Sequence, residues 1–276
     1  MYLERNDALS VIERMRIFEN ALKTSFENQG YDLRENLGRR NILLSMSQEK
    51  ETANVLRRKF KEVESDGAPG KPDVVIHDIN KELECKLTSG SKTKGSVSFA
   101  LQTDWATLKK KGKLDYAYIL CNDSFDEFCF AFFDGLTTDD FFPPANGSRG
   151  KSRMNKAKAM RKLRCLVGGV ESVSEKHIEK INKEYQQKST EMTMRMSALA
   201  KRCNELSPKA TVAKGKIEDT IQNERNRYVA SLNKLLARKK YWENHPAFSF
   251  KFEKVSFEEK KEGFFMKLYR YLKNLL

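Results

Sequence analysis

Residues 70–87 read GKPDVVIHDINKELECKL, and this stretch predicts a β-hairpin around which the rest of the chain is organised. The first arm is the β-branched run at residues 74–76, entered through Pro72, and the Asp and Asn residues that follow favour a tight turn. In the second arm successive side chains face opposite sides of the strand. One face carries Glu82, Glu84 and Lys86, and the other carries Leu83, Cys85 and Leu87.

Two carboxylates are expected to meet on the polar face of this hairpin. Asp73 stands at the mouth of the first arm, where it can lie beside Glu84 on the second. A pair of carboxylates offers the hard oxygen ligands that Mg²⁺ prefers. Lys86 shares the face, and its ammonium group can hold a phosphate or orient an attacking water while a metal neutralises developing charge. The pattern predicts phosphodiester hydrolysis.

Pro72-Asp73 and Glu84-Cys85-Lys86 resemble the signature of the PD-(D/E)xK nuclease superfamily, which includes many type II restriction endonucleases and junction resolvases. The resemblance implies that Asp73 and Glu84 bind Mg²⁺, that the backbone carbonyl of Cys85 adds a ligand and that Lys86 assists the attacking water. It covers roughly residues 47–134 and implies an α/β (α+β) fold, with a restriction-endonuclease-like αβββαβ core and a mixed central sheet. Cleavage would leave 5′-phosphate and 3′-hydroxyl ends.

The tripeptide Glu-x-Lys by itself carries little information in this chain. It recurs at residues 258–260 and 259–261, in a polar run without apolar alternation or a preceding Pro-Asp. The prediction therefore depends on Pro72-Asp73 and on the alternation around Glu84 and Lys86. The alternative is a solvated strand face with cross-strand ion pairs, which leaves Pro-Asp at the strand mouth unexplained.

Two auxiliary site residues follow from the same resemblance. In a subset of the superfamily an acid on the helix before the hairpin joins the metal site, and a helix beginning at Ser47 is predicted here. Glu51 is the first candidate, because it lies one turn before Val55 on the packed side, and Glu49 is the second. Both acids could instead simply favour the positive end of the helix. Gln102, on a helix predicted at 98–111, is the other candidate.

Composition narrows the classes of protein to be considered. A hydrophobic fraction of 39% supports a core, and no apolar run approaches the roughly 20 residues of a membrane helix. No secretory signal is visible at the N-terminus, so a cytoplasmic location is expected. Five cysteines without a CxxC spacing and three scattered histidines favour reduced thiols and offer little for a zinc site or for histidine catalysis.

The charge of the chain predicts a polyanionic partner, and the resemblance implies that this partner is double-stranded DNA. The formal net charge is +14, with 31 Lys and Arg against 14 Asp and Glu from Ser148 onward. Residues 149–164 hold eight basic residues and no acid, and are interpreted as a helix with a cationic face, although a charge run is usually a solvated surface. The loop at 88–96 could contact phosphates or be an ordinary surface loop. The candidate DNA-binding residues are Lys92, Lys94, Arg149, Lys151, Arg153, Lys156, Lys158, Arg161 and Lys162.

Periodicity outlines the remaining elements. Helices are predicted at 3–26 and 264–276, strands at 114–121, 127–134 and 248–252, and a long antiparallel helical hairpin at 174–206 and 211–242. This hairpin is interpreted as a dimerisation arm, a DNA clamp or a packed subdomain. The predicted regions are an N-terminal helical segment (1–46), a nuclease core (47–147), a basic helical region (148–246) and a C-terminal strand and helix (247–276).

These observations predict an enzyme, a Mg²⁺-dependent type II restriction endonuclease that needs no nucleotide cofactor and has no membrane partner. Because duplex cleavage at a symmetric site needs two active sites, a homodimer is expected. The alternative within the enzyme class is a structure-specific or repair nuclease like a junction resolvase. Outside that class, the alternatives are a non-catalytic DNA-binding protein and a helical scaffold with incidental positive charge.

Overall fold

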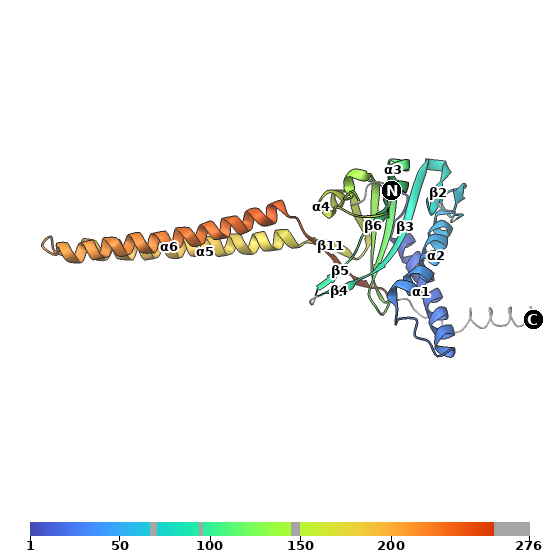
Figure 1. Ribbon diagram of the computed structural model, residues 1–276, viewed down its shortest axis with the longest axis horizontal. Helices are drawn as coiled ribbons and strands as arrows, with labels where there is room; N and C mark the ends of the chain where they lie inside the picture. The colour runs from blue at the N-terminus through green and yellow to red at the C-terminus, as the bar shows by residue number, and fades with distance from the viewer. Residues whose placement is uncertain (67–70, 94–95, 145–149, 257–276) are drawn as a thin grey trace, which may run out of the picture. The chain divides into compact units, whose positions relative to one another are not determined.

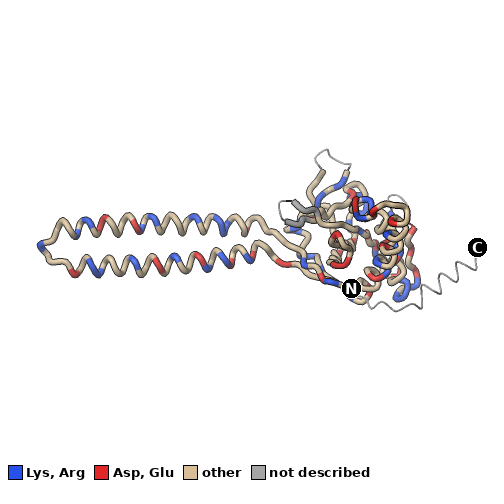
Figure 2. The backbone as a smooth tube through the Cα atoms, turned by 90° about the horizontal axis from the view of Figure 1, so that it is seen from below, with Lys and Arg blue, Asp and Glu red and all other residues tan. Residues whose placement is uncertain are grey.

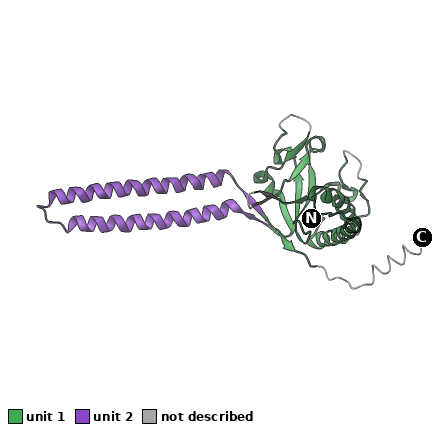
Figure 3. Cartoon of the chain, turned by 60° about the horizontal axis from the view of Figure 1, so that its bottom comes forward, with its two compact units in different colours: residues 1–169, 250–276 green, residues 170–249 purple. Residues whose placement is uncertain are grey.

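The computed structural model describes residues 1–66, 71–93, 96–144 and 150–256, with the backbone alone at 91–93 and 96–98. The chain divides into two compact units (Figure 3). The first unit is formed by Met1–Gly169 with Phe250–Leu276, and the second by Val170–Ser249. The sequence-predicted boundary at 147/148 lies before this division, because the chain that follows it supplies a further strand to the first unit's sheet.

The first unit is built on a mixed sheet in the order β1-β2-β3-β7-β8-β10, with β13 also paired to β8 (Figure 1). Strands β3 and β7 are parallel and the other pairs are antiparallel, which confirms the predicted mixed α/β class. Every residue of β7 is buried, as its continuous apolar run predicts. The strands are β1 (Val63–Glu64), β2 (Val74–Ile76), β3 (Lys81–Ser89), β7 (Leu114–Cys121), β8 (Glu127–Leu136), β10 (Leu163–Val167) and β13 (Glu253–Lys254).

The two faces of the sheet contact different partners because alternate strand residues point to opposite sides. On one face Cys85 and Ile119 belong to a core shared with helices α1 (Arg5–Asn28) and α2 (Leu37–Leu56). On the other face Tyr116 and Tyr118 pack in a second core with Leu108 of α3 (Trp105–Lys111) and with Phe250. Along the chain, α2 precedes β1-β2-β3, and α3 precedes β7, but the short strands β4 (Ser91–Thr93), β5 (Ser96–Ser98) and β6 (Gln102–Asp104) are inserted between β3 and α3.

The hairpin predicted at residues 70–87 is present as β2 and β3. Val74 pairs with Leu83, so continuing the antiparallel register places Asp73 opposite Glu84. The turn is a short 3₁₀ helix, η1 (His77–Ile79), followed by Asn80 with φ of 49°. Asn tolerates this left-handed conformation better than most residues, so the turn chemistry matches the backbone.

Helix α2 begins ten residues before the predicted start at Ser47. The side chain of Asn36 caps it by accepting a hydrogen bond from the backbone N–H of Arg39 at 3.0 Å. Arg40 is fully buried on the packed side, where its guanidinium donates to the backbone carbonyl of Asp123 at 2.6 Å. A charged residue within the apolar stripe disguises the helical period, which explains the error.

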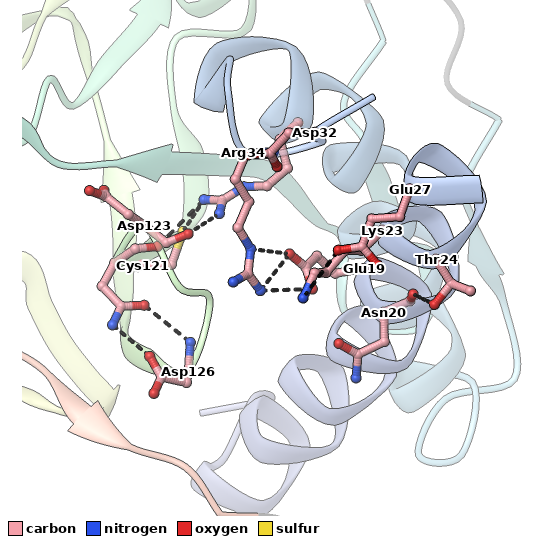
Figure 4. A network of polar contacts seen from close by, with 12 residues as sticks. Glu19, Asn20, Lys23, Thr24, Glu27, Asp32, Arg34, Cys121, Asp123 and Asp126 are labelled. Carbon is pink, nitrogen blue, oxygen red and sulfur yellow. Dashed lines mark hydrogen bonds and ion pairs between the residues drawn. The ribbon is translucent and has the colours of Figure 1, made fainter. Parts of the chain in front are cut away.

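Arg40 reaches the loop between β7 and β8, which Figure 4 shows beside the link from α1 to α2. In that loop Asn122 donates to Asp126 at 2.6 Å, and in the link Arg34 forms an ion pair with the buried Glu19 at 3.1 Å. These contacts fix the entry to α2, and therefore the orientation of the helix that faces the hairpin.

Of two further predicted helices, the one at 98–111 is confirmed only in its second half, and the one at 149–164 is largely wrong. Helix α3 begins at Trp105 instead of residue 98, because Asp104 caps it by accepting from the backbone N–H of Thr107 at 2.8 Å. Residues 149–164 contain β9 (Lys151–Arg153), the single turn α4 (Lys156–Ala159), η3 (Met160–Lys162) and the start of β10. Strand β9 alternates exposed and buried residues and pairs with β6 (Gln102–Asp104). The remaining elements of this unit are β4 (Ser91–Thr93), β5 (Ser96–Ser98) and η2 (Thr138–Asp140).

The second unit is the predicted antiparallel helical hairpin, formed by α5 (Val173–Asn204) and α6 (Thr211–Asn244). Its buried apolar residues are few, namely Ile181, Leu232 and Leu235. Farther from these the helices are joined by polar contacts, including the ion pair of Arg195 with Glu224 at 2.9 Å. Lys, Arg, Asp and Glu are spread along both helices (Figure 2). Strands β11 (Gly169–Ser172) and β12 (Phe248–Lys251) form a two-stranded sheet where the chain leaves and re-enters the first unit.

Three further predictions concern the cysteines, membrane helices and the C-terminus. All five cysteines are free, as their odd number and spacing predict. Within residues 1–256, apart from the three short internal gaps, no helix is long and apolar enough to cross a membrane. The helix predicted at 264–276 lies outside the described residues.

Candidate active site

Asp73, Glu84 and Lys86 converge at the open end of the β2–β3 hairpin. The Nζ atom of Lys86 lies 2.5 Å from Oε1 of Glu84 and 3.8 Å from Oδ2 of Asp73. The backbone N–H of Cys85 donates to the same Oδ2 of Asp73 at 2.7 Å, which fixes that carboxylate against β3. An ammonium group therefore stands between two carboxylates that come from neighbouring strands.

The local structure explains why these three side chains meet. Strand β2 begins one residue after Asp73, so Asp73 lies at the strand mouth where the chain enters the sheet. In the parallel pairing with β7, Glu84 lies opposite Tyr116 and Lys86 opposite Tyr118, which places both on the second face of the sheet. The site is thus built from the register of three adjacent strands, and the residues predicted from the sequence to form it are brought together.

Burial dominates the electrostatics of the site. The side chains of Asp73 and Glu84 are 17% and 12% exposed, and burial raises the pKa of each carboxyl group although the nearby Lys86 opposes the effect. Burial alone would lower the pKa of Lys86, but Glu84 and Asp73 outweigh it and hold that pKa above its usual value. Lys86 is therefore an ammonium group at neutral pH.

One carboxylate oxygen at this site lacks a partner. Oε2 of Glu84 is buried and accepts no hydrogen bond from any residue that the structure describes. Such an atom loses its hydration without compensation, which makes it a strong acceptor for a cation or a donor group.

Glu49, the second of the two candidate acids on α2, is the one that faces the site. Burial, together with the neighbouring Asp73 and Glu84, raises the pKa of Glu49 to about 7, against the opposing effect of Lys86. Glu51, the first candidate, instead accepts a hydrogen bond from the side chain of Asn54 in its own helix at 3.1 Å. A residue three positions after Glu49, Thr52, is buried and interacts with Cys85 of β3, so this side of α2 faces the hairpin.

Strand β6 supplies a further acid that sequence reasoning missed. Asp104 lies close enough to help raise the pKa of Glu84, while its carboxylate caps α3. Its neighbour Thr103 shares a buried 2.6 Å hydrogen bond with the hydroxyl of Tyr116. Nothing in the sequence pattern connects Asp104 with the hairpin, because the contact depends on how β6 folds back over β7.

Gln102 lies on β6 and not on a helix. It pairs with Arg153 of β9, and its backbone carbonyl accepts a hydrogen bond from the hydroxyl of Tyr118 at 2.7 Å. The predicted site helix therefore begins after Gln102, and the auxiliary role predicted for this residue remains a prediction.

The six candidate DNA-binding residues whose side chains the structure describes fall into two groups. Lys151, Arg153, Lys158 and Arg161 are exposed, and Lys151 lies opposite Asp104, which places the basic strand β9 beside the candidate site. Two others are engaged within the protein. Lys162 forms a 2.6 Å ion pair with Asp140, and Lys156 lies over the ring of Phe250, where burial lowers its pKa. Lys94 and Arg149 lie outside the described residues, as does the side chain of Lys92.

The ligand set available to a metal ion is small. In the described part of the chain, no group of three or more His, Cys, Asp and Glu side chains is arranged to hold a metal ion. The predicted set consists of the Asp73 and Glu84 carboxylates with the backbone carbonyl of Cys85.

Comparison with known proteins adds no assignment. No protein-family model matches the chain, and neither a curated protein nor a solved structure is detectably similar to it.

Proposed function

We propose that this protein is a Mg²⁺-dependent endonuclease of double-stranded DNA, acting as a type II restriction enzyme of the PD-(D/E)xK kind. The observation that carries the proposal is the position of the Lys86 ammonium between the partly buried carboxylates of Asp73 and Glu84. The order of α2, the strands β1-β2-β3, α3 and the parallel strand β7 supports it, with β4 to β6 inserted before α3, because the superfamily resemblance implies a helix, strands, a helix and a strand in this sequence.

The donor set fits a hard divalent cation. Asp73, Glu84 and the Cys85 carbonyl offer oxygen ligands only, and the unpartnered Oε2 of Glu84 needs a positive partner. Glu49, with its raised pKa, would add a further carboxylate when it loses its proton. Bound Mg²⁺ supplies a water of lowered pKa and neutralises charge that develops on the phosphate.

Lys86 has a separate role in this proposal. As a partly buried ammonium, it donates a hydrogen bond to the attacking water or to a phosphate oxygen. Electrostatic stabilisation of this kind is stronger where water is partly excluded, as it is here. Because Glu84 fixes its Nζ at 2.5 Å, the donor is positioned before substrate binds.

DNA affinity is assigned to the exposed basic residues beside the site. Lys151 and Arg153 lie on β9, which pairs with the strand that carries Asp104. Contacts of Lys and Arg with phosphates make binding fall steeply with salt concentration. Cleavage of both strands at a symmetric site would require two copies of the chain.

A structure-specific nuclease, similar to a junction resolvase, is the second candidate. The observation that favours it is the exposed ring of Tyr241 near the end of α6, since exposed aromatic side chains suit unpaired bases better than duplex. A restriction enzyme would cut mixed plasmid DNA into discrete, sequence-fixed fragments, whereas a resolvase would cut only branched substrates.

The test compares Asp73→Asn with a matched control, Glu82→Gln, on the same hairpin. Glu82 forms an ion pair with Lys111 at 2.6 Å and takes no part in the proposed chemistry. We expect Asp73→Asn to abolish cleavage in Mg²⁺ while changing DNA binding in Ca²⁺ little, and Glu82→Gln to cleave like the unaltered protein. Cleavage that survives both Asp73→Asn and EDTA would show that the proposed mechanism is wrong.

A further inference from the structure

The second half of α6 combines positive charge with aromatic residues. Between Glu224 and Glu243 it carries six Lys and Arg residues and no acid, and this stretch ends in Tyr241 and Trp242. Cations near a helix C-terminus are favourable in any protein, so charge alone indicates little. The basic residues are Arg225, Arg227, Lys234, Arg238, Lys239 and Lys240.

Four rings are stacked where α5 begins and α6 ends, and we call them the aromatic platform. Tyr241 stacks on His245 with ring centroids 4.4 Å apart and planes inclined by 18°. Trp242 stacks on His177 of α5 at 4.3 Å and 7°. Tyr241 and Trp242 meet edge to face at 5.5 Å, so the two stacks form one continuous group.

Hydrogen bonds hold the platform in place. Nδ1 of His245 lies 2.8 Å from the backbone carbonyl of Tyr241, and because a carbonyl only accepts, Nδ1 carries the proton and donates. The buried Ser174 donates from Oγ to the carbonyl of His245 at 3.2 Å and accepts from the N–H of Ala247 at 2.6 Å. A ligand would therefore meet rings that are already ordered, which reduces the entropic cost of binding.

Exposure distinguishes Tyr241 from a core residue. Trp242 is half-buried, and its stack with His177 closes the end of the helical hairpin. Tyr241, by contrast, is 55% exposed although it is held in a stack. An ordered aromatic ring that faces solvent offers a flat surface for a further ring.

Free ammonium groups accompany this surface. Within the described residues, no ion pair involves Lys180, Lys234 or Lys240, all of which are exposed. Arg238 and Lys239 have only long contacts, at 3.7 Å with Glu184 and 3.9 Å with Glu243. These cations are available to phosphate groups near the platform.

We propose that the aromatic platform binds unpaired nucleotides, with a base stacked on Tyr241 and the flanking phosphates on the lysines of α5 and α6. In a duplex the faces of the bases are covered by their neighbours and only their edges are accessible. Stacking on Tyr241 therefore requires a single strand, a flap or a frayed end. The binding proposal depends only on residues of the second unit. Its consequence, that the substrate contains unpaired DNA, rests on the second candidate function, the structure-specific nuclease.

Trp242 provides the readout, because the chain has only two tryptophans and Trp105→Phe leaves Trp242 as the only one. Full-length protein in EDTA is titrated with a 12-nucleotide oligo(dT) and with a blunt duplex of the same length. We expect saturable quenching of Trp242 by the single strand and weaker binding of the duplex. Loss of one base stack should weaken single-strand binding by about 5- to 100-fold in Tyr241→Ala.

Control variants separate stacking from charge and from folding. Tyr241→Phe should bind within about 2-fold of the parent, because it keeps the ring. Tyr241→Leu keeps apolar bulk and should bind as weakly as Tyr241→Ala, with unchanged helical circular dichroism in both. Lys240→Gln should weaken the binding of both ligands and lower the salt dependence of the binding constant by the equivalent of about one phosphate contact.

Equal affinity for single strand and duplex, or a Tyr241→Leu variant that binds like the parent, would overturn the platform proposal. Either result leaves the nuclease proposal untouched, because the titration contains no Mg²⁺. Conversely, if the protein binds oligo(dT) through Tyr241 but cleaves no DNA, the platform proposal stands and the nuclease proposal is wrong.

Discussion

Replacing Glu49 with Gln should stabilise the first unit above pH 7 and leave its stability nearly unchanged near pH 4.5. The pKa of Glu49 in the folded chain is about 7, against 4.5 for an ordinary glutamate. Between these values the folded chain holds a proton that the unfolded chain has lost. The free energy of unfolding therefore falls as pH rises through this window. Gln cannot ionise, so the variant avoids that loss.

The magnitude follows from the size of the pKa difference. One pKa unit corresponds to about 1.4 kcal/mol. Because Glu49 is half-buried, solvent screening reduces the full value to about 1–2 kcal/mol at pH 8. The parent's loss of unfolding free energy begins near pH 4.5. It is complete somewhat above pH 7, where Glu49 is ionised in both the folded and the unfolded chain.

Urea unfolding followed by circular dichroism at pH 5, 6, 7 and 8 measures this effect. The matched control is Glu51→Gln, because the Glu51 carboxylate contacts Asn54 of its own helix and not the site. A gain of equal size in the control would assign the effect to helix charge. If the difference in unfolding free energy between Glu49→Gln and the parent is no larger at pH 8 than at pH 5, the placement of Glu49 among the site carboxylates is refuted.

Two further pairs of substitutions test other parts of the fold. Gly168 has φ of +70°, and a Cβ there would overlap a backbone carbonyl oxygen, so Gly168→Ala should lower the free energy of unfolding by about 2–4 kcal/mol. A Cβ at Gly215 of α6 would meet open space, so Gly215→Ala should raise the free energy of unfolding by about 0.5–1 kcal/mol. Urea titrations measure both changes. The ammonium of Lys162 and neighbouring hydrogen bonds hold the pKa of the buried Asp140 below its usual value. Because Lys162→Gln removes this ammonium, it should lower the free energy of unfolding by about 1–2 kcal/mol. In filter-binding assays it should leave DNA affinity within about twofold, while Arg153→Gln should weaken binding and reduce its salt dependence.

The hairpin and its three central residues were predictable because their geometry is local. Alternation along β3 determines that Glu84 and Lys86 share a face, and the turn length sets the register that brings Asp73 opposite Glu84. The buried strand β7 was equally predictable from its continuous apolar run.

The choice between Glu49 and Glu51 could not be made from the sequence. Both residues flank the packed stripe of α2, on opposite sides of Gln48 and Thr52. Which flank faces the hairpin depends on how the helix is rotated against the sheet. That rotation is set by tertiary contacts, such as the hydrogen bond from the Gln48 side chain to the carbonyl of Ala117 at 2.9 Å.

The basic segment at 149–164 was misread because charge patterns do not determine secondary structure. Its spacing is compatible with a helix, but Ser152 is buried between two exposed basic residues, and Leu163 pairs with Phe133 of β8. Pairing with distant strands overrides the local preference here. A tertiary contact likewise hides Asp104, whose position at the site depends on how β6 packs over Tyr116 and Tyr118 of β7.

The proposed nuclease activity can be measured by incubating sequenced duplex DNA with the purified protein, with and without Mg²⁺, and mapping the ends of the products. We expect cleavage only with Mg²⁺ and products with 5′-phosphate and 3′-hydroxyl ends. Equal cleavage in EDTA, or no cleavage of plasmid or branched DNA at any Mg²⁺ concentration by a protein that binds DNA, would contradict the assignment of Asp73, Glu84 and Lys86 as a nuclease site.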